Sequence, residues 1–339
     1  MKILVTGAKG FIAGYVIEEL LNNNWTVVGL DNLSKYGNVA KSYDNHSSYT
    51  FIKGDVKDTE LMKEVLSDCD HFLAGAAMIG GISYFHEFAY DLLAENERIT
   101  ASSCDAAIYA YRQNKLKKLT MMSSSMVYES TDLYPTPEGN QLNCPPPLST
   151  YGFQKLATEY FVKGANEQYG LPYTILRPFN CIGTGEKRAK ADVEITSGNV
   201  KLALSHVVPD LVQKILKGQD PLHILGDGSQ IRHYTYGGDL ARGIRLGIES
   251  EKSINEDFNL STSVSTSVLE LAEIIWKKIN PDKPFRYISD KPFKYDVNKR
   301  VPSVEKAENL LKFKAETTIS TALDEIIPWI KDQIRKGGI

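Results

Sequence analysis

The sequence predicts an α/β protein in which a doubly wound parallel sheet is joined to a smaller mixed α/β lobe at the C-terminal end. Two observations predict it. In the first half, short β-branched and apolar runs alternate with segments whose apolar residues recur at helical spacing, and strands that alternate with helices form a parallel sheet covered on both faces. After residue 180 the units become shorter, and a polar, glycine-bearing stretch at 183–199 separates them from the first half.

Each expected element follows from a local pattern. Short apolar runs predict strands over 2–6, 25–30, 49–54, 70–75, 116–124 and 172–178. Helical spacing predicts a helix that starts near Phe11 and two long helices near 87–113 and 150–169. The apolar stripe of the last helix consists of Phe153, Leu156, Ala157, Tyr160, Phe161 and Gly164. The second half predicts a strand over 222–225 and helices near 206–217, 238–249, 267–278 and 319–335.

Length and composition are those of an ordinary globular protein. The chain has 339 residues, of which 42% are hydrophobic and 24% charged. Because the formal net charge is −3, we expect no general basic surface for nucleic acid or anionic lipid. The sequence starts without a signal-peptide pattern, and no run has the length of a membrane-spanning helix. We therefore expect a cytoplasmic protein without nucleic-acid or membrane partners.

Neither a metal site nor a disulfide framework is expected. The four cysteines are widely spaced and form no CxxC pair, which favours reduced buried thiols. Four histidines do not cluster with acidic residues at ligand spacing. The cysteines are Cys69, Cys104, Cys144 and Cys181, and these histidines are His86, His206, His223 and His233.

A glycine-rich turn follows the first strand directly. In "VTGAKGFIAG", Gly7 and Gly10 stand between this strand and the helix that begins with Phe11 and Ile12. Glycine allows a sharp turn and lets backbone N–H groups approach a pyrophosphate at the helix N-terminus. The alternative is a glycine turn that binds no ligand.

Acidic residues end the next two strands. Asp31 is placed to accept hydrogen bonds from the adenosine ribose and to repel a 2′-phosphate, which favours NAD over NADP. Asp55 ends the third strand and could meet the adenine amino group. The alternative is that Asp55 or Asp58 caps the following helix.

A tyrosine and a lysine stand one helical turn apart in "STYGFQKLATEY". Tyr151 and Lys155 therefore lie on one face of the helix predicted over 150–169. An ammonium group beside a phenol favours the phenolate, which can act as a base. The alternative is an ordinary surface pair.

In this order the motifs resemble the extended branch of the short-chain dehydrogenase/reductase superfamily, the nucleotide-sugar epimerases and dehydratases. The resemblance spans nearly the whole chain and rests on "TGAKGFIAG", "LDN", "GDVKD", "SSSMVYE", "YGFQK", "RPFNCIG", "GDGSQIRHYTYGGDLARG" and "NKRVPSVEKAENLL". It implies a Rossmann-type NAD-binding domain over 1–180 with a return segment near 230–262, and a lobe over 181–339 that mainly binds a nucleotide-diphosphate sugar. It also implies a homodimer through the two long helices, although their apolar stripes could instead pack only on the sheet.

The resemblance implies catalytic roles for three residues. Tyr151 is similar to the family's catalytic base and Lys155 to its partner. The charge of Lys155 and of the nicotinamide ring would lower the pKa of the phenol from about 10 toward neutrality. Tyr151 would then take a proton from a sugar hydroxyl while hydride leaves the same carbon for NAD⁺. Lys155 would also hold the nicotinamide ribose, and Ser124 would share the hydrogen bond to the substrate.

Further contacts are implied at matching positions. For the cofactor they are Phe11, Ile12, Asn32, Val56 and Ala76. For the substrate they are Gly81, Ser83, Ser125, Asn180, Val207, Arg232 and Arg300. The two arginines are expected to bind the diphosphate, and the alternative is that they are surface arginines. For the loop of Gly81 and Ser83, the alternative is that it covers the site without binding the substrate. "LSHVVPDLV", which contains Val207, resembles the base-binding stretch of members that use GDP-sugars.

Departures from the family pattern narrow the chemistry. Ala13 stands where the family usually has glycine, with Gly14 one position later. Met126 stands where dehydratases carry an acid and 3,5-epimerases a cysteine, and methionine can neither give nor take a proton. Glu129 follows the motif and is expected to point elsewhere. What remains is chemistry at one carbon, C4.

The sequence therefore predicts an NAD-dependent nucleotide-sugar 4-epimerase that acts through a transient 4-keto intermediate. The same residues would serve a C4 dehydrogenase or ketoreductase whose cofactor exchanges. A dehydratase or decarboxylase is a weaker alternative. An NAD(H)-binding regulatory protein is the non-enzymatic one.

Overall fold

A seven-stranded parallel sheet forms the centre of the molecule. The computed structural model describes residues 1–79, 88–186, 195–197, 200–202, 206–291 and 297–337. The strand order is β13-β6-β5-β4-β1-β2-β3, and every neighbouring pair is parallel. The strands are β1 (Lys2–Thr6), β2 (Thr26–Asp31), β3 (Tyr49–Lys53), β4 (His71–Ala74), β5 (Lys118–Met122), β6 (Tyr173–Pro178) and β13 (Glu256–Leu260).

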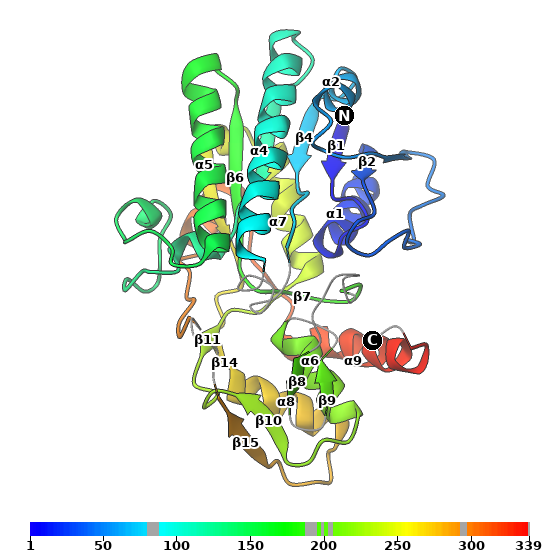
Figure 1. Cartoon of the computed structure of the whole chain (residues 1–339), viewed down its shortest axis with the longest axis vertical. Coiled ribbons are helices and arrows are strands. Elements are labelled where there is room, and N and C mark those ends of the chain that lie inside the picture. The colour runs from blue at the N-terminus through cyan, green and yellow to red at the C-terminus, as the bar shows by residue number, and fades with distance from the viewer. Residues whose placement is uncertain (80–87, 187–194, 198–199, 203–205, 292–296, 338–339) are drawn as a thin grey trace.

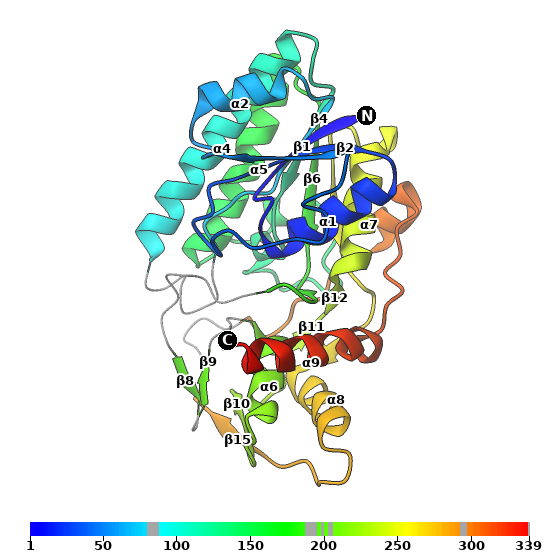
Figure 2. The same cartoon turned by 90° about the vertical axis from the view of Figure 1, so that its right-hand side faces the viewer.

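Helices cover both faces of this sheet (Figures 1 and 2). One face carries α2 (Thr59–Leu66), α4 (Ala89–Arg112) and α5 (Thr150–Tyr169), and the other carries α1 (Phe11–Asn22) and α7 (Gly237–Glu249). Strand β1 shows why, because its side chains alternate between the faces. Ile3 and Val5 join the core with α1 and α7, whereas Leu4 joins the core with α2, α4 and α5. The predicted doubly wound parallel sheet is confirmed.

Helix α5 buries its polar side and exposes its apolar stripe. Phe153, Tyr160 and Phe161 are 47%, 61% and 41% exposed. The buried residues of this helix are Tyr151, Gly152, Gln154, Lys155, Thr158, Glu159, Val162 and Ala165. The alternative that the stripe packs on the sheet is therefore wrong for these three aromatic residues. Two contacts help the polar side to be buried: the amide nitrogen of Gln154 donates to Thr158 at 2.7 Å, and Glu159 pairs with Arg177.

A second lobe lies beyond the carboxyl ends of the strands (Figure 1). Its apolar core is formed by α6 (Val207–Leu216), α8 (Val268–Ile279) and α9 (Ile319–Arg335), together with β10 (Leu222–Leu225), which pairs in parallel with β15 (Tyr287–Asp290). Three two-stranded ladders complete the lobe and its junction with the sheet: β7 (Cys181–Ile182) with β12 (Thr235–Tyr236), β11 (Ile231–Arg232) with β14 (Thr266–Ser267), and β8 (Ile195–Ser197) with β9 (Val200–Leu202).

Short helical turns lie at Ser125–Tyr128, Asn140–Leu142, Glu251–Ser253 and Ala307–Leu311. None of the helices described has both the length and the apolar character that crossing a membrane requires. All four cysteines are free thiols. Cys69 and Cys104 are buried as expected, whereas Cys144 and Cys181 are partly exposed.

Candidate active site

A cavity of about 790 Å³ lies where the strands of the sheet end and the second lobe begins. Its lining comes from the segments that follow β1, β2, β3, β4, β5 and β6, which is where open parallel sheets bind ligands. Seventeen of the predicted positions line this cavity: Gly7, Gly10, Phe11, Ile12, Asp31, Asn32, Asp55, Val56, Ala76, Ser124, Ser125, Tyr151, Lys155, Asn180, Val207, Arg232 and Arg300. Gly81 and Ser83 lie outside the described residues.

The glycine turn passes very close to the segment after β4. Gly7 has a φ of +74°, and a Cβ atom there would lie 3.1 Å from the Cα atom of Ala76. A Cβ atom at Gly10 would lie 2.9 Å from the carbonyl oxygen of Gly7. Helix α1 then begins without a side-chain cap, so its first N–H groups can bind an anion. A turn of this shape fits the pyrophosphate of a dinucleotide.

Two carboxylates stand side by side at the ends of β2 and β3. Asp31 is held in the turn because it accepts hydrogen bonds from the backbone N–H groups of Lys9 at 2.9 Å and Leu33 at 2.7 Å. The side chain of Asn32 donates to Asp55 at 3.1 Å, which links the two strand ends. Helix α2 is capped by Asp58 and not by Asp55. Asp55 is thus left at the edge of the cavity.

The start of α5 fixes the position of Tyr151. The hydroxyl of Ser149 caps the helix by accepting from the N–H of Gly152 at 3.0 Å. Glu129 in turn accepts from the N–H and the hydroxyl of Ser149, at 3.0 and 2.7 Å. Glu129 therefore anchors the helix and does not line the cavity, as expected. Tyr151 and Lys155 are both buried, one turn apart.

Burial governs the ionisation of the two groups. Burial raises the pKa of Tyr151 above its ordinary value, and a hydrogen bond with Ser124 and the charge of Arg300 offset this only in part. Burial also lowers the pKa of Lys155 to about 8, opposed by the charge of Glu159. The ammonium of Lys155 donates to the carbonyl oxygen of Met122 at 3.1 Å. Without the cofactor, desolvation of the phenolate therefore outweighs the charges around Tyr151. The expected decrease of its pKa includes the charge of the nicotinamide ring and stays a prediction.

Two arginines lie together on the side of the second lobe. Arg232 of β11 is buried, and its guanidinium donates to the carbonyl oxygens of Ile231 at 2.9 Å and Asn298 at 3.3 Å. The backbone N–H of Arg300 also donates to the carbonyl oxygen of Ile231, at 3.1 Å. The segment of Arg300 thus runs along β11 and places both side chains on the cavity. Neither position matches a plain surface arginine.

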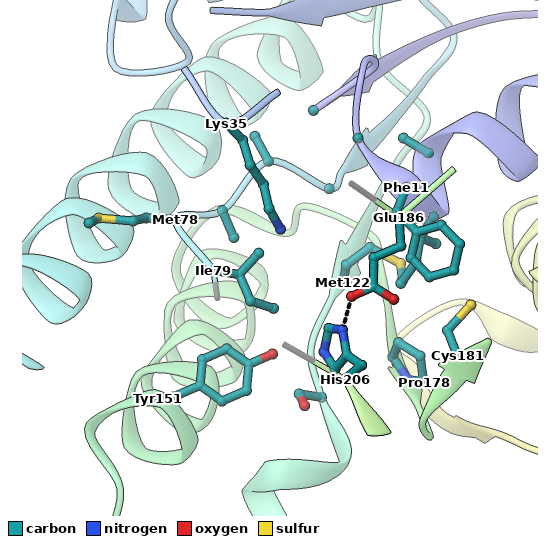
Figure 3. A pocket seen from close by; sticks show the side chains of 18 of the residues that line it. Phe11, Lys35, Met78, Ile79, Met122, Tyr151, Pro178, Cys181, Glu186 and His206 are labelled. Carbon is teal, nitrogen blue, oxygen red and sulfur yellow. Dashed lines mark hydrogen bonds and ion pairs between the residues drawn. The ribbon is translucent and has the colours of Figure 1, made fainter. Parts of the chain in front are cut away.

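Sequence reasoning missed a carboxylate–imidazole pair in the same cavity. Glu186 and His206 are hydrogen-bonded through Oε1 and Nδ1, and Figure 3 shows this pair and Tyr151 around one cavity. The charge of Glu186 raises the pKa of His206, so the imidazole is more readily protonated near neutral pH. The two residues are far apart in sequence, and no local pattern joins them. Figure 3 also places Lys35, likewise missed, above this pair.

The comparison with known proteins decides the family. A family model described as the NAD dependent epimerase/dehydratase family matches residues 3–261. The chain belongs to this family. The expectation of NAD as the cofactor is confirmed with it, and the glycine turn and Asp31 described above fit such a cofactor.

Similar proteins cover nearly all of this epimerase/dehydratase family member. A protein of Methanocaldococcus jannaschii, provisionally named UDP-glucose 4-epimerase, is 31% identical over 337 residues, covering 98% of this chain and 99% of the relative. The crystal structure of UDP-glucose 4-epimerase from Thermotoga maritima with UDP-glucose has a TM-score of 0.81 at 26% identity, covering 98% of this chain and 100% of that one. UDP-glucuronic acid 4-epimerase from Bacillus cereus, in complex with UDP-glucuronic acid and NAD, has a TM-score of 0.82 at 26% identity, covering 98% and 99%.

Proposed function

We propose that this protein is an NAD-dependent nucleotide-sugar 4-epimerase that acts through a 4-keto intermediate. One observation carries the proposal: Ser124, Tyr151 and Lys155 line the cavity that also contains the glycine turn. Met126 supports it, because this thioether packs against Tyr151 and offers no proton transfer. The similarity to 4-epimerases with UDP-sugars supports a nucleoside-diphosphate sugar as the substrate class.

We assign the following roles to the residues of the cavity. Tyr151, as phenolate, takes the proton from the C4 hydroxyl, while Ser124 donates a hydrogen bond to the same oxygen. Lys155 holds the nicotinamide ribose. Arg232 binds the diphosphate through the forked N–H groups of its guanidinium, and Arg300 adds a second cationic contact. When bound, NAD⁺ would supply the acceptor of the C4 hydride, its return to C4 from the reduced cofactor, and a positive charge beside the phenol. Tyr151 returns the proton after the keto sugar has turned its other face.

The division of labour follows the two lobes. We propose that residues 1–180, with the return segment near 230–262, bind the cofactor and that residues 181–339 mainly bind the nucleotide sugar. Gly7, which follows β1, and Asp31, which ends β2, lie at the same edge of the sheet and support the first assignment. Val207, which begins α6 in the second lobe and lines the cavity, supports the other.

The Glu186–His206 pair favours a second candidate. A keto group at C4 acidifies the C–H bonds at C3 and C5, and a protonatable imidazole in the same cavity could exchange such a proton. Oxidation at C4 would then be followed by inversion at a neighbouring carbon. The two candidates share Tyr151 and differ in whether a carbon-bound hydrogen comes from solvent.

Incubation in D₂O with UDP-, GDP-, dTDP- and CDP-sugars separates these possibilities. For a 4-epimerase we expect the C4 epimer by NMR, no deuterium on carbon and no net change in the absorbance of NADH. Deuterium at C3 or C5 would favour the second candidate. Stoichiometric conversion of NAD(H) would instead indicate a dehydrogenase or ketoreductase, and loss of water from the sugar a dehydratase.

We further propose a homodimer through α4 and α5, and this gives a separate prediction. The two helices pack against each other and expose aromatic side chains, with Phe153, Tyr160 and Phe161 on α5 and Tyr90 and Tyr109 on α4. Exposed aromatic side chains of this kind are typical of a protein interface. Combining Phe153→Glu with Tyr160→Glu should raise the dimer Kd by at least about 100-fold, because each carboxylate would be buried without a partner.

Sedimentation equilibrium measures this change. Tyr287→Glu is the matched control, because Tyr287 is an aromatic residue of β15 with comparable exposure, on the second lobe. It should leave the association unchanged. A monomeric unsubstituted protein, or a dimer that survives both substitutions on α5, would contradict the proposal.

A further inference from the structure

A buried ion pair lies directly beneath the predicted catalytic residues. Glu159 is one helical turn beyond Lys155 on α5 and is 1% exposed, and Arg177 of β6 is fully buried. The guanidinium binds the carboxylate through two parallel hydrogen bonds, Nε to Oε1 and Nη2 to Oε2, each 2.7 Å long. Arg177 also pairs with Asp257 of β13 at 2.7 Å. Two-pronged geometry of this kind fixes the orientation of the carboxylate.

Glu159 also reaches the strand end that carries the catalytic serine. The hydroxyl of Ser123, the residue before Ser124, donates to Oε1 of Glu159 at 2.6 Å. One turn earlier on the same helix, Lys155 donates to the carbonyl oxygen of Met122 at 3.1 Å. Helix α5 therefore holds the segment before Ser124 at two successive residues, and Glu159 makes one of the two contacts.

The same carboxylate acts on the charge of Lys155. Burial lowers the pKa of this lysine to about 8, and the negative charge of Glu159 opposes the decrease. Helix α4, which packs on α5, shares a small cavity with Lys155 through the neutral groups of Asn96 and Thr100. The titratable and charged groups that the structure describes around this ion pair come from several elements. They are Tyr151 and Glu159 on α5, Arg177 and Tyr173 on β6, Asp257 on β13, and Tyr128, Glu138 and Lys306 beside them.

We propose that Glu159 is a positioning residue of the reaction, which orients Ser124 through Ser123 and keeps the ammonium group of Lys155 charged. The inference rests on the proposed function, because Ser124 and Lys155 must be the groups that act. A purely structural ion pair would satisfy Arg177 alone. Glu159 also accepts a hydrogen bond from Ser123 and lies one helical turn from Lys155. Asp257, the other partner of Arg177, has neither of these features.

Glu159→Gln tests the proposal, with Asp257→Asn as the matched control. Glutamine keeps the size of the side chain and an oxygen that can accept from Ser123, but it removes the charge. Two quantities are measured against pH: the affinity for NADH, followed by the fluorescence of NADH, and kcat/KM. In Glu159→Gln, the decrease of both at alkaline pH should occur about one pH unit lower than in the unsubstituted protein, because loss of a nearby opposite charge lowers the pKa of Lys155. Asp257→Asn should lose stability but keep the alkaline limb in place.

Two further variants make the result decisive. Glu159→Asp keeps the charge and should retain the alkaline limb of the unsubstituted protein, and a limb displaced as in Glu159→Gln would overturn the proposal. If Glu159→Gln does not fold, Ser123→Ala removes only the hydrogen bond; we expect kcat to fall about tenfold with little change in KM or Tm. An unchanged kcat, or identical alkaline limbs in Glu159→Gln and the unsubstituted protein, would also overturn it.

The role of Glu159 and the proposed epimerase activity can be tested separately. NADH titration needs no sugar substrate, so it reports on Lys155 even if every nucleotide sugar is refused. Absence of turnover by the unsubstituted protein, together with the expected shift in NADH binding, would contradict the proposed function and leave the link between Glu159 and Lys155 intact.

Discussion

Tyr151→Phe is expected to lower kcat by about 10²- to 10⁴-fold, which corresponds to about 3–5 kcal/mol of transition-state stabilisation. The substitution removes the phenolic oxygen that we propose takes the proton from the sugar, and it leaves the ring in place against Leu92 and Met126. KM should change little, because Arg232 and Arg300 are assigned to the diphosphate. The measurement is a steady-state assay of the epimer formed, with NADH fluorescence as a check that cofactor binding persists.

Tyr134→Phe is the matched control for this result. The hydroxyl of Tyr134 also makes a hydrogen bond, donating to the carbonyl oxygen of Thr131 at 2.9 Å, but the residue does not line the cavity. Its removal should leave kcat unchanged. If Tyr151→Phe retained kcat within about threefold of the unsubstituted protein, a barrier difference below about 1 kcal/mol, the assignment of Tyr151 as the base would be untenable.

Arg177→Met is expected to lower the free energy of unfolding by about 3–5 kcal/mol. Arg177 binds two carboxylates, Glu159 and Asp257, and it also donates to the hydroxyl of Tyr128 at 2.8 Å. Methionine fills much of the volume but leaves Glu159 charged and buried without its main partner. Urea unfolding, followed by circular dichroism, measures the change.

Arg286→Met is the control for Arg177→Met. Arg286 pairs with Asp220 at 2.9 Å, but its side chain is well exposed. Solvent screens such a pair, so we expect a loss below about 1 kcal/mol. Equal losses at the two positions would show that the buried network contributes no more than a surface pair.

The pH dependence of stability should also differ between Arg177→Met and the unsubstituted protein. Burial by itself raises the pKa of Asp257, but Arg177 and Lys306 outweigh this and lower the pKa to about 2. Ionised Asp257 therefore stabilises the fold at neutral pH, and this contribution disappears as the pH falls from about 4 to about 2. Without Arg177 the folded-state pKa rises, so Arg177→Met should unfold in acid at a higher pH.

Local signals accounted for most of the secondary structure. The helix predicted over 150–169 has the bounds of α5, because Ser149 caps its first turn and Gly170, with a φ of +73°, ends it. The glycine turn and the acid at the end of β2 were equally visible, since each lies next to the strand that positions it. Motifs that act through neighbouring backbone can be recognised in the chain without its tertiary partners.

The face that α5 buries could not be predicted in the same way. Hydrophobic spacing marks Phe153, Tyr160 and Phe161 as core residues, yet they are exposed. Helix α5 can bury Glu159 because Arg177, on strand β6, neutralises its charge. The Glu186–His206 pair was invisible for the same reason, since the interaction depends on how distant segments meet. Burial of Tyr151 in the folded cavity, which raises the pKa of its phenol, is likewise reported by no motif.

The last strand of the sheet constrains synthesis of the chain. Strand β6 ends at Pro178 and its neighbour β13 begins at Glu256, a separation of 78 residues. At about 5–20 residues per second, a ribosome needs several seconds to make that interval. During it the nascent sheet presents β6 as an unpaired apolar edge, a surface that favours aggregation, with Arg177 lacking Asp257. A fragment that stops near residue 180 would retain this edge permanently, so we expect that the half proposed to bind the cofactor cannot be excised or transplanted alone.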